Sequence, residues 1–268
     1  MNLLTPPRLD KTAVKNSFNR YASEYDHTAI LQAEVQSRLL ERLDYIKLQP
    51  KTIVDLGCGP GQAIKPLLKR YKKSTVIGFD MAHAMLREAK KKYGLFDRKC
   101  LINADMDQLP LADDSVDLIF SSLAMQWSND LLETFKGFKR VGREGGLLMF
   151  TTFGVNTLHE LRESWQMVDD RPRVHHFIDM HDVGDMMLAA GLSQPVLDMD
   201  RITLEYDHFR DLLKDLKAIG ATNAEKNRSR GLLTARRLKK LEDAYRNIAF
   251  KNGRYLATYE VVFGHAWF

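Results

Sequence analysis

The sequence predicts an α/β protein built on a doubly wound, mostly parallel sheet of seven strands. An N-terminal helical arm precedes the sheet, and a helical insert precedes its last strand. Two observations predict this fold. Short apolar segments typical of buried strands alternate with segments of helical periodicity, the βαβα order of parallel sheets. In addition, the first of these strands runs into the glycine-rich turn 57–61, a feature of α/β units that bind nucleotides.

The first 48 residues form the predicted arm, because apolar residues recur at spacings of three and four between Lys11 and Leu48. Residues 49–268 form the domain that carries the sheet. Within it, segments 155–180 and 207–254 interrupt the regular alternation of strands and helices. We expect both segments and the arm to cover the carboxyl ends of the parallel strands, where open α/β sheets bind their ligands.

Five strands and three helices follow from hydrophobic periodicity. The strands are expected at Thr52–Leu56, Thr75–Asp80, Cys100–Ala104, Val116–Ser121 and Leu147–Phe153. The helices are expected at Gln62–Tyr71, Ala82–Tyr93 and Leu131–Val141. A turn over Arg143–Gly146 precedes the fifth strand, which is long and β-rich enough to be a buried central strand.

The carboxyl-terminal part predicts two further strands separated by a long insert. A helix over Asp182–Ala190 ends at Gly191, and the two strands are Val196–Tyr206 and Ala257–Gly264. The insert contains a helix over Phe209–Ile219, a turn over Gly220–Asn223, a basic loop over Lys226–Arg230 and a helix over Thr234–Phe250. It is too long for a hairpin connection.

Composition places the chain among globular proteins. Of its 268 residues, 44% are hydrophobic and 28% are charged, and no apolar run approaches the roughly 20 residues that span a bilayer. Residues Met1–Asp10 lack the apolar core of a secretory signal, so we expect a cytoplasmic location.

Cys58 and Cys100 suit small buried side chains better than a disulfide or a zinc site. The net charge of +5 suggests a nucleic acid, an acidic protein or a charged small molecule as partner.

Acidic residues at two strand ends narrow the ligand of the glycine turn. Asp80 ends the second predicted strand, where a carboxylate can accept hydrogen bonds from ribose hydroxyls, as it does in NAD enzymes. The glycines, however, follow a GxGxG spacing and not the dinucleotide spacing GxGxxG. The third strand ends in Asp105-Met106, where an aspartate can bond an adenine amino group and an apolar side chain can cover the ring. Together these features favour S-adenosylmethionine (SAM).

Residues 50–155 resemble the class I SAM-dependent methyltransferases, which have a Rossmann-like fold. The segments that carry the resemblance are DLGCGPG, GFD, ADMDQLPLADDSVDLIFSS and EGGLLMFTTF. Glu144 departs from the pattern, because the family usually has proline before the two glycines. The expected cofactor-binding residues are Asp55, Gly57, Gly59, Gly61, Asp80, Met81, Asp105, Met106 and Ser121.

The resemblance implies a role for each part of this set. Asp55, Gly57 and Gly61 would lie near the methionine and ribose, Asp80 at the ribose, and Asp105 with Met106 at the adenine. If these residues had no part in cofactor binding, Asp55 would only cap the turn, and Met81 and Met106 would only pack in the core.

The group that accepts the methyl group must be inferred from segments other than the cofactor motifs. The loop Ser121–Trp127 lacks an NPPY-like sequence, typical of exocyclic-amine methylation, and the Pro-Cys pair of C5-pyrimidine enzymes is also missing. Nucleic acid is therefore disfavoured. A carboxylate acceptor is already ionised near pH 7 and needs no general base, only a few aimed donors. Arg20, Arg173 and His175 are among the groups that could supply them.

Segments outside the core resemble the malonyl-acyl carrier protein O-methyltransferases of biotin synthesis. They are SFNRYA, LAMQW, TTFG, DLK with GATN, and TYEV, and the resemblance covers nearly the whole chain. It implies a SAM-dependent carboxyl O-methyltransferase that esterifies a malonyl thioester and leaves S-adenosylhomocysteine. Malonyl-acyl carrier protein or malonyl-CoA would be the substrate, and the methyl ester would prime pimeloyl formation. An acidic carrier protein suits the basic balance of the chain.

The residues expected at the acceptor are Tyr21, Tyr25, Gln126, Arg171 and Tyr206. For Phe18 and Trp127 core packing is the stronger interpretation. The basic residues of 226–240 either receive the carrier protein or form a solvated surface. His175, His176 and His181 are not expected to bind a metal. The alternative functions are methylation of another small carboxylic acid or of RNA, and SAM binding without catalysis.

Overall fold

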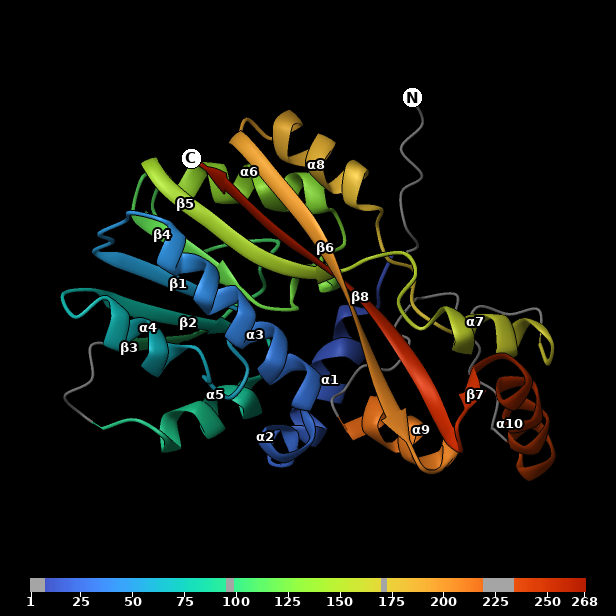
Figure 1. Ribbon diagram of the computed structural model, residues 1–268. Helices are drawn as coiled ribbons and strands as arrows, with labels where there is room; N and C mark the ends of the chain where they lie inside the picture. The colour runs from blue at the N-terminus through green and yellow to red at the C-terminus, as the bar shows by residue number, and fades with distance from the viewer. Residues whose placement is uncertain (1–7, 95–98, 170–172, 219–233) are drawn as a thin grey trace.

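The computed structural model describes residues 8–94, 99–169, 173–218 and 234–268, and it has one mostly parallel sheet between two layers of helices (Figure 1). Seven strands follow one another across the sheet in the order β3-β2-β1-β4-β5-β8-β6. Their bounds are β1 Thr52–Leu56, β2 Thr75–Asp80, β3 Lys99–Asn103, β4 Val116–Ser121, β5 Gly142–Phe153, β6 Ser193–Tyr206 and β8 Arg254–Trp267.

Pairing in this sheet is parallel from β3 to β5, and β8 runs antiparallel to both β5 and β6. The two-residue strand β7 (Phe250–Lys251) pairs only with β8. The predicted seven-stranded, mostly parallel and doubly wound sheet is confirmed. The order of the strands reverses at β1, which lies between β2 and β4. A crevice forms at such a point, outside the carboxyl ends of the strands.

The turn predicted over Arg143–Gly146 is wrong, because β5 already begins at Gly142. Gly142 pairs with Val116 of β4, and the register then shifts before Leu118 pairs with Leu147. Gly145 has a φ of +75°, the left-handed conformation that glycine adopts at little cost. The two glycines therefore make a bulge inside a long strand, and this bulge bends the strand without ending it.

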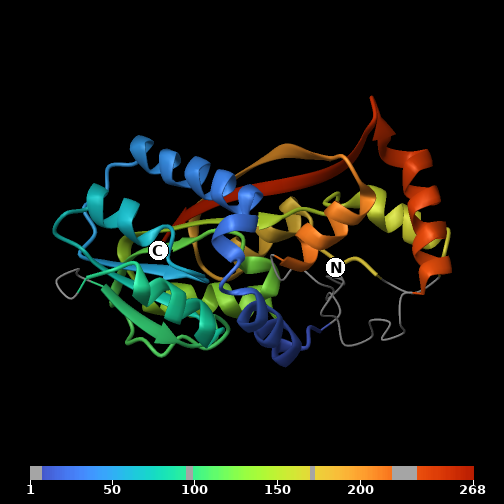
Figure 2. The same cartoon turned by 90° about the horizontal axis from the view of Figure 1, so that it is seen from below.

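Helices cover both faces of the sheet (Figure 2). Side chains of α4 (Ile64–Arg70) pack in one apolar cluster with one face of the sheet. Side chains of α6 (Leu131–Val141) and α8 (Met180–Ala189) pack in a second cluster on the opposite face. Helix α5 (His83–Lys91) packs against β2 and β3. The prediction for α6 is confirmed to the residue.

The arm is helical, but it is not one helix. It consists of α1 (Lys11–Tyr21), the single turn α2 (Tyr25–Thr28), α3 (Ile30–Arg42) and a short 3-10 turn, η1 (Leu43–Tyr45). Helix α3 buries Leu31, Val35 and Leu39 against the sheet, whereas α1 buries only Val14. The breaks between these helices allow α3 to pack on the sheet while α1 crosses its carboxyl edge.

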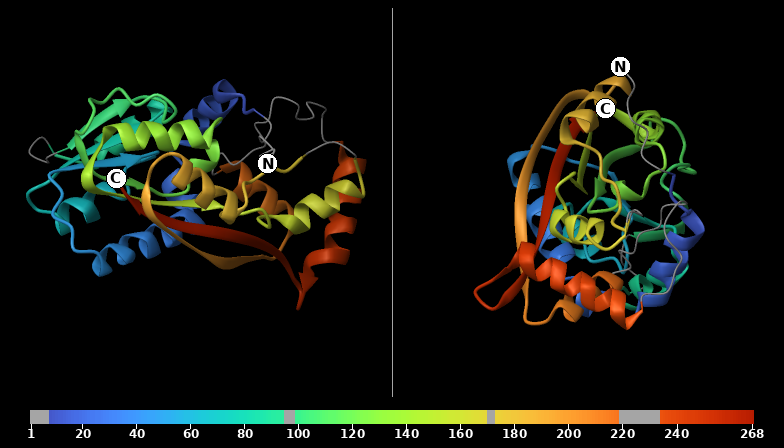
Figure 3. Two further views of the ribbon diagram at one scale, coloured as in Figure 1. Left: turned by 90° about the horizontal axis from the view of Figure 1, so that it is seen from above. Right: turned by 90° about the vertical axis from the view of Figure 1, so that its right-hand side faces the viewer.

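Strands β6 and β8 extend beyond the rest of the sheet. Residues 255–260 of β8 pair with β6 but not with β5, whose pairing with β8 ends at Phe153 and Val261. Around this overhang lie α7 (His159–Gln166), α9 (Phe209–Ala218) and α10 (Ala235–Ala249), all at one end of the molecule (Figure 3). These helices belong to the two segments that interrupt the regular alternation, and that these segments cap the carboxyl edge of the strands stays a prediction. The expected turn Gly220–Asn223 and basic loop Lys226–Arg230 lie outside the described residues.

Candidate active site

A cavity lies at the carboxyl edge of the sheet, beside the point where the strand order reverses, and its empty space of about 580 Å³ includes open solvent. Its walls come from the arm, from the ends of β1 and β2, from the loops that follow β1, β2, β3 and β4, and from α5. The lining residues are Phe18, Tyr25, Leu56, Gly57, Gly59, Phe79, Asp80, Met81, Met85, Ala104, Asp105, Met106, Ser122, Leu123, Ala124 and Trp127.

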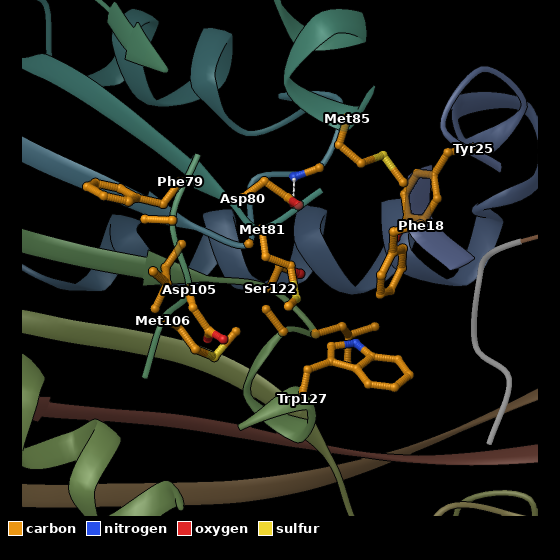
Figure 4. A pocket seen from close by; sticks show the side chains of 16 residues that line it. Phe18, Tyr25, Phe79, Asp80, Met81, Met85, Asp105, Met106, Ser122 and Trp127 are labelled. Carbon is orange, nitrogen blue, oxygen red and sulfur yellow. Dashed lines mark hydrogen bonds between the residues drawn. The ribbon is translucent and has the colours of Figure 1, made fainter. Parts of the chain in front are cut away.

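Figure 4 shows how these side chains divide the cavity. Asp105 and Met106 lie at one end, and Phe18, Tyr25 and Trp127 lie at the other, with Asp80 and Ser122 between them. One end is therefore lined by an acid and a thioether, and the other end is aromatic. An elongated ligand with two chemically different ends would fit such a division.

The glycine turn forms one wall of the cavity and requires glycine for two distinct reasons. Gly57, Gly59 and Gly61 all have positive φ, at +68°, +52° and +80°. A Cβ on Gly57 would lie 2.4 Å from the Cβ of Ala124, whereas a Cβ on Gly59 would meet no protein atom within 4 Å. Gly57 therefore allows two loops to approach each other, and Gly59 leaves the cavity open to a ligand.

Gly61 does not line the cavity. A Cβ there would lie 3.1 Å from the Cβ of Ala89 in α5. Its carbonyl oxygen accepts a hydrogen bond from the hydroxyl of Tyr93. Gly61 therefore fixes the turn against the neighbouring helix and does not face the ligand.

Asp80 is the acidic residue at the centre of the cavity. Its two carboxylate oxygens accept hydrogen bonds from the amide of Gly59 at 2.9 Å and from the amide of Ala82 at 2.7 Å. Burial raises the pKa of Asp80 to about 6, although both hydrogen bonds act in the opposite direction. Each oxygen keeps a second lone pair, so the side chain is oriented by the turn and can still accept from a ligand.

Asp55 lies behind the lining, with only 2% of its surface exposed. Burial and the negative charge of Asp80 raise the pKa of Asp55 to about 8. Its Oδ2 atom is buried and has no hydrogen-bond partner among the described residues. Two buried carboxyl groups that repel each other favour a cationic ligand, because a positive charge between them offsets their repulsion.

Asp105 connects the opposite end of the cavity to the arm. Its Oδ1 atom accepts from the Lys11 ammonium group at 2.8 Å and from the Asp107 amide at 3.1 Å. Lys11 also lies 3.0 Å from the carboxylate of Asp107. Met106 and Met81 also line the cavity, and their role at an adenine ring stays a prediction. The contacts of Lys11 hold the start of α1 over the end of the cavity that Asp105 lines.

The aromatic end brings together residues that are distant in sequence. The rings of Phe18 and Trp127 meet edge to face at a centroid distance of 5.4 Å, and Phe18 and Tyr25 lie 6.5 Å apart. Burial and the charges of Asp80 and Asp26 raise the pKa of Tyr25, so its hydroxyl remains protonated at neutral pH. Phe18 and Trp127 were expected to be core residues, yet both also line the cavity. The sequence shows only that both residues are aromatic, and this character alone does not place them at the cavity.

The loop after β4 contributes a different serine from the expected one. Ser121 is fully buried and donates to the carbonyl oxygen of Leu56 at 2.9 Å, so it does not line the cavity. Ser122 does line it, and its hydroxyl oxygen is buried with no partner among the described residues. Ser121 is the last residue of β4 and Ser122 is the first residue after it, so a shift of one position decides which hydroxyl lines the cavity. The sequence alone does not show which serine of the pair faces the cavity.

The next residue of this loop, Leu123, has a φ of +49°, a strained conformation for a side chain of its size. Its amide donates to the hydroxyl of Thr151 at 2.9 Å, and its carbonyl accepts from the Nε2 atom of Gln126 at 2.6 Å. Both backbone groups are thus held by side chains. Strain that is held in this way is common at functional sites.

The residues expected at the acceptor are not all brought together. Tyr25 lines the cavity, Tyr21 does not, and Gln126 lines a neighbouring cavity. Tyr206 lines a separate groove and donates to Asp215 at 2.7 Å. Arg171 lies outside the described residues. The cap also supplies His175, whose ring lies 5.7 Å from that of Trp127.

The residues that the structure describes, 8–94, 99–169, 173–218 and 234–268, lack two features. Nowhere in those ranges do three His, Cys, Asp or Glu side chains gather in a group that could hold a metal ion. Within the same ranges, no helix combines the length and the apolar character needed to cross a membrane. Cys58 and Cys100 are both free thiols, the first buried and the second exposed.

Residues 54–150 match a family model described as a methyltransferase domain. A malonyl-acyl carrier protein O-methyltransferase of Halorhodospira halophila is 48% identical over 261 residues, which cover 97% of this chain and 88% of the relative. The chain belongs to the malonyl-acyl carrier protein O-methyltransferase family, which is SAM-dependent. A second member, from Gallionella capsiferriformans, is 44% identical over 97% of this chain and 91% of its own length.

Solved structures with the same fold share less sequence with this chain. The YcgJ protein of Bacillus subtilis aligns over 88% of this chain and 98% of its own, with a TM-score of 0.61 and 15% identity. A geranyl diphosphate C-methyltransferase of Streptomyces coelicolor, solved with S-adenosyl-L-homocysteine, aligns over 88% and 80% with a TM-score of 0.52 and 15% identity. These likenesses establish the methyltransferase fold, and the family assignment rests on the sequence relatives.

Proposed function

We propose that this chain transfers the methyl group of SAM to the free carboxylate of a malonyl group held as a thioester on acyl carrier protein. The observation that carries the proposal is the 48% identity to a malonyl-acyl carrier protein O-methyltransferase, because it extends through the arm and the cap as well as the cofactor core. The product is the malonyl methyl ester that primes pimeloyl formation in biotin synthesis. A chain with these substrates works where carrier protein and SAM are both present, in keeping with the expected cytoplasmic location.

In this proposal, SAM lies along the cavity. Asp105 and Met106 hold the adenine, and Asp80 accepts from the ribose hydroxyls while its other lone pairs keep the glycine turn in place. Bound SAM supplies a methyl group on a positively charged sulfur. The unpartnered Oδ2 atom of Asp55 and the charge of Asp80 provide the negative potential that this cation and the methionine ammonium group require.

The aromatic end of the cavity orients the acceptor carboxylate. Tyr25 keeps its proton, and both its hydroxyl and that of Ser122 can donate a hydrogen bond to an oxygen of the carboxylate. Phe18 and Trp127 exclude water and place aromatic faces near the sulfonium. As the methyl group moves, the negative charge of the carboxylate and the positive charge of the sulfonium neutralise each other, and a dry site favours this change. A few aimed donors therefore suffice, whereas a strong ion pair to the attacking oxygen would stabilise the ground state more than the transition state and oppose the reaction.

No residue of the chain needs to remove a proton, because a carboxylate with a pKa of about 4 is already ionised at neutral pH. The roles of the residues are to position the carboxylate and to exclude water. The rate of a single turnover should accordingly stay nearly constant between about pH 6 and 8. A steep rise controlled by one group near neutrality would contradict direct attack by the carboxylate.

The basic residues of 226–240 are proposed to receive the acidic carrier protein. Lys226, Arg228 and Arg230 lie outside the described residues. On α10, Arg237 pairs with Asp169 at 2.5 Å, so its charge is largely used within the protein. Arg236 and Lys240 are exposed on the same helix and are the described candidates for carrier contact. Malonyl-CoA, which lacks the protein surface, is the alternative substrate.

The proposal is tested by incubating the purified protein with methyl-labelled SAM and, separately, malonyl-acyl carrier protein, malonyl-CoA and bulk tRNA. We expect label in a base-labile ester of the malonyl thioester. The variant Asp80→Asn should lose this activity, and Asp113→Asn, which removes an exposed acid paired with Arg140, should keep it. Label in RNA, or cofactor binding without transfer to any malonyl thioester, would overturn the proposal.

A further inference from the structure

A second cavity, whose empty space of about 430 Å³ includes open solvent, lies on the other side of the one-turn helix η2 (Met125–Trp127). Trp127 lines the cofactor cavity, and its neighbour Gln126 lines the second cavity. The polar residues of the second cavity are Gln126, Ser128, Asn129, Thr152, His175 and His176, and its apolar residues include Phe153 and Phe177. A single helical turn therefore separates the cofactor from a wall of mixed polarity.

The side chain of Gln126 has one end occupied and one end vacant. Its Nε2 atom donates to the carbonyl oxygen of Leu123 at 2.6 Å. This contact fixes the orientation of the amide, because the opposite orientation would place two acceptor oxygens against each other. The Oε1 atom is buried and has no hydrogen-bond partner among the described residues. A buried acceptor without a donor is rare and needs an explanation.

The chemistry of Oε1 restricts what can satisfy it. An amide oxygen only accepts hydrogen bonds, so the ionised malonyl carboxylate, which offers no donor, cannot be its partner. The remainder of the substrate does offer donors. Acyl carrier protein and CoA both carry their acyl group on a pantetheine arm, in which amide N–H groups alternate with methylenes. The mixture of apolar rings and polar side chains around the second cavity suits such an arm.

We propose that the second cavity holds the pantetheine arm of the substrate and that Gln126 Oε1 accepts the amide N–H nearest the thioester sulfur. This inference rests on the proposed function. The malonyl carboxylate then passes η2 and reaches the aromatic end of the cofactor cavity beside Trp127. His175 holds the same turn from the cap, since its Nε2 atom lies 3.2 Å from the backbone oxygen of Gln126.

Gln126 also has a structural task, which the test must separate from substrate binding. Its Nε2 atom holds the strained Leu123 from one side, and the hydroxyl of Thr151 holds the same residue from the other. Thr151→Val therefore removes one of these two supports without changing Oε1. It serves as the matched control for Gln126→Met, which removes both the support and the acceptor.

The test compares two malonyl thioesters that differ in one group. In the first, the thiol is N-acetylcysteamine, which carries the amide of the arm; in the second it is 5-sulfanylpentan-2-one, where CH₂ replaces that N–H. For the native protein we expect kcat/KM to be about tenfold higher with the amide, the effect of one ordinary hydrogen bond. Gln126→Met should lower this preference to about one.

Thr151→Val should lower kcat by a similar factor for both thioesters and keep the preference, and Thr151→Ser should restore kcat. Cofactor affinity of each variant, measured by calorimetry, reports whether it is folded. Methylation of both thioesters with no preference in the native protein would overturn the arm site alone. A preference that survives in Gln126→Met would do the same. Failure to methylate any malonyl thioester, malonyl-acyl carrier protein included, would overturn the proposed function and the arm site together.

Discussion

Two buried carboxyl groups dominate the electrostatics of the cofactor cavity. Asp80 and Asp55 both have raised pKa values, about 6 and about 8, because burial disfavours their charged forms. A bound cation such as the sulfonium of SAM would lower the pKa of each residue and favour its ionised form. Cofactor binding and ionisation of these residues should therefore promote each other.

This coupling predicts how the affinity for SAM depends on pH. In the free protein Asp55 takes up a proton as the pH falls below about 8, and Asp80 as it falls below about 6, so the dissociation constant of SAM should rise with each proton taken up. Calorimetric titration between pH 5 and 9 measures this dependence. Asp80→Asn should bind weakly and lose the part of the rise that begins near pH 6, and Asp113→Asn should behave as the native protein does. An affinity that stays constant down to pH 5 would contradict the role of Asp80.

The glycine turn predicts a contrast between two alanine substitutions. Gly59→Ala should cost about 1–2 kcal/mol of stability, the usual penalty for a left-handed alanine, because its Cβ meets no protein atom. Gly57→Ala adds the clash with Ala124 and should cost about 3 kcal/mol or more. Urea unfolding measures both values. Gly59→Ala should nevertheless lose most of its SAM affinity, and unchanged binding would show that the ligand does not approach this position.

At the scale of elements, polar and apolar contacts together hold the arm over the cavity. Lys11 pairs with Asp105 and Asp107, and the amide of Leu9 donates to Asn129 at 2.7 Å. Asn19 accepts from the amide of Ala84 at 2.9 Å and so caps α5, whose own N-cap residue provides no side-chain bond. Leu9 and Val14 are buried in a small apolar cluster with Trp127.

Lys11→Met should weaken this closure while leaving the domain folded. It removes two ion pairs at the start of α1 but keeps the length of the side chain. We expect SAM to dissociate about five- to tenfold faster, the loss of about 1 kcal/mol of interaction, with little change in the melting temperature of the cofactor-free protein. Stopped-flow fluorescence of Trp127 and the other tryptophans measures the rate. Lys15→Met, at an exposed position of the same helix, is the matched control.

At the scale of the whole molecule, β6 and β8 extend past the end of β5, and α10, which carries the exposed Arg236 and Lys240, packs against β8. With a net charge of +5, the chain should also attract an acidic partner over long range.

Charge attraction predicts a difference between large and small substrates. Raising the salt concentration from about 50 to 300 mM should lower kcat/KM for malonyl-acyl carrier protein several-fold, because salt screens exposed charges. The malonyl thioester of N-acetylcysteamine should be little affected. The double variant Arg236→Ala/Lys240→Ala should reduce kcat/KM for the carrier-protein substrate alone, and Lys72→Ala/Lys73→Ala, on the loop after α4, serves as the control. Equal losses for both substrates would contradict a carrier-protein contact on α10.

Much of the fold was predictable because it follows from local patterns. The bounds of β1, β2, β4 and α6 agree with the structure, since alternation and helical periodicity are read from neighbouring residues. The bulge at Gly145 and the division of the arm into three helices were not predicted. Both depend on what packs against the segment: the pairing of β5 with β4, and the crossing of α1 over the cavity.

The sequence by itself determined the methyl donor. Three glycines follow the first strand, and Asp80 and Asp105 lie at or just after the ends of the next two, so a parallel sheet brings these segments together at its carboxyl edge. It also carried the family assignment. Only the tertiary structure decided that Ser122 and not Ser121 lines the cavity, that Tyr25 lines it while Tyr206 lines a separate groove, and that Gln126 lines a second cavity. The reason is physical. A strand end can be read from local sequence, but the direction of a loop side chain depends on contacts with residues far away in the chain.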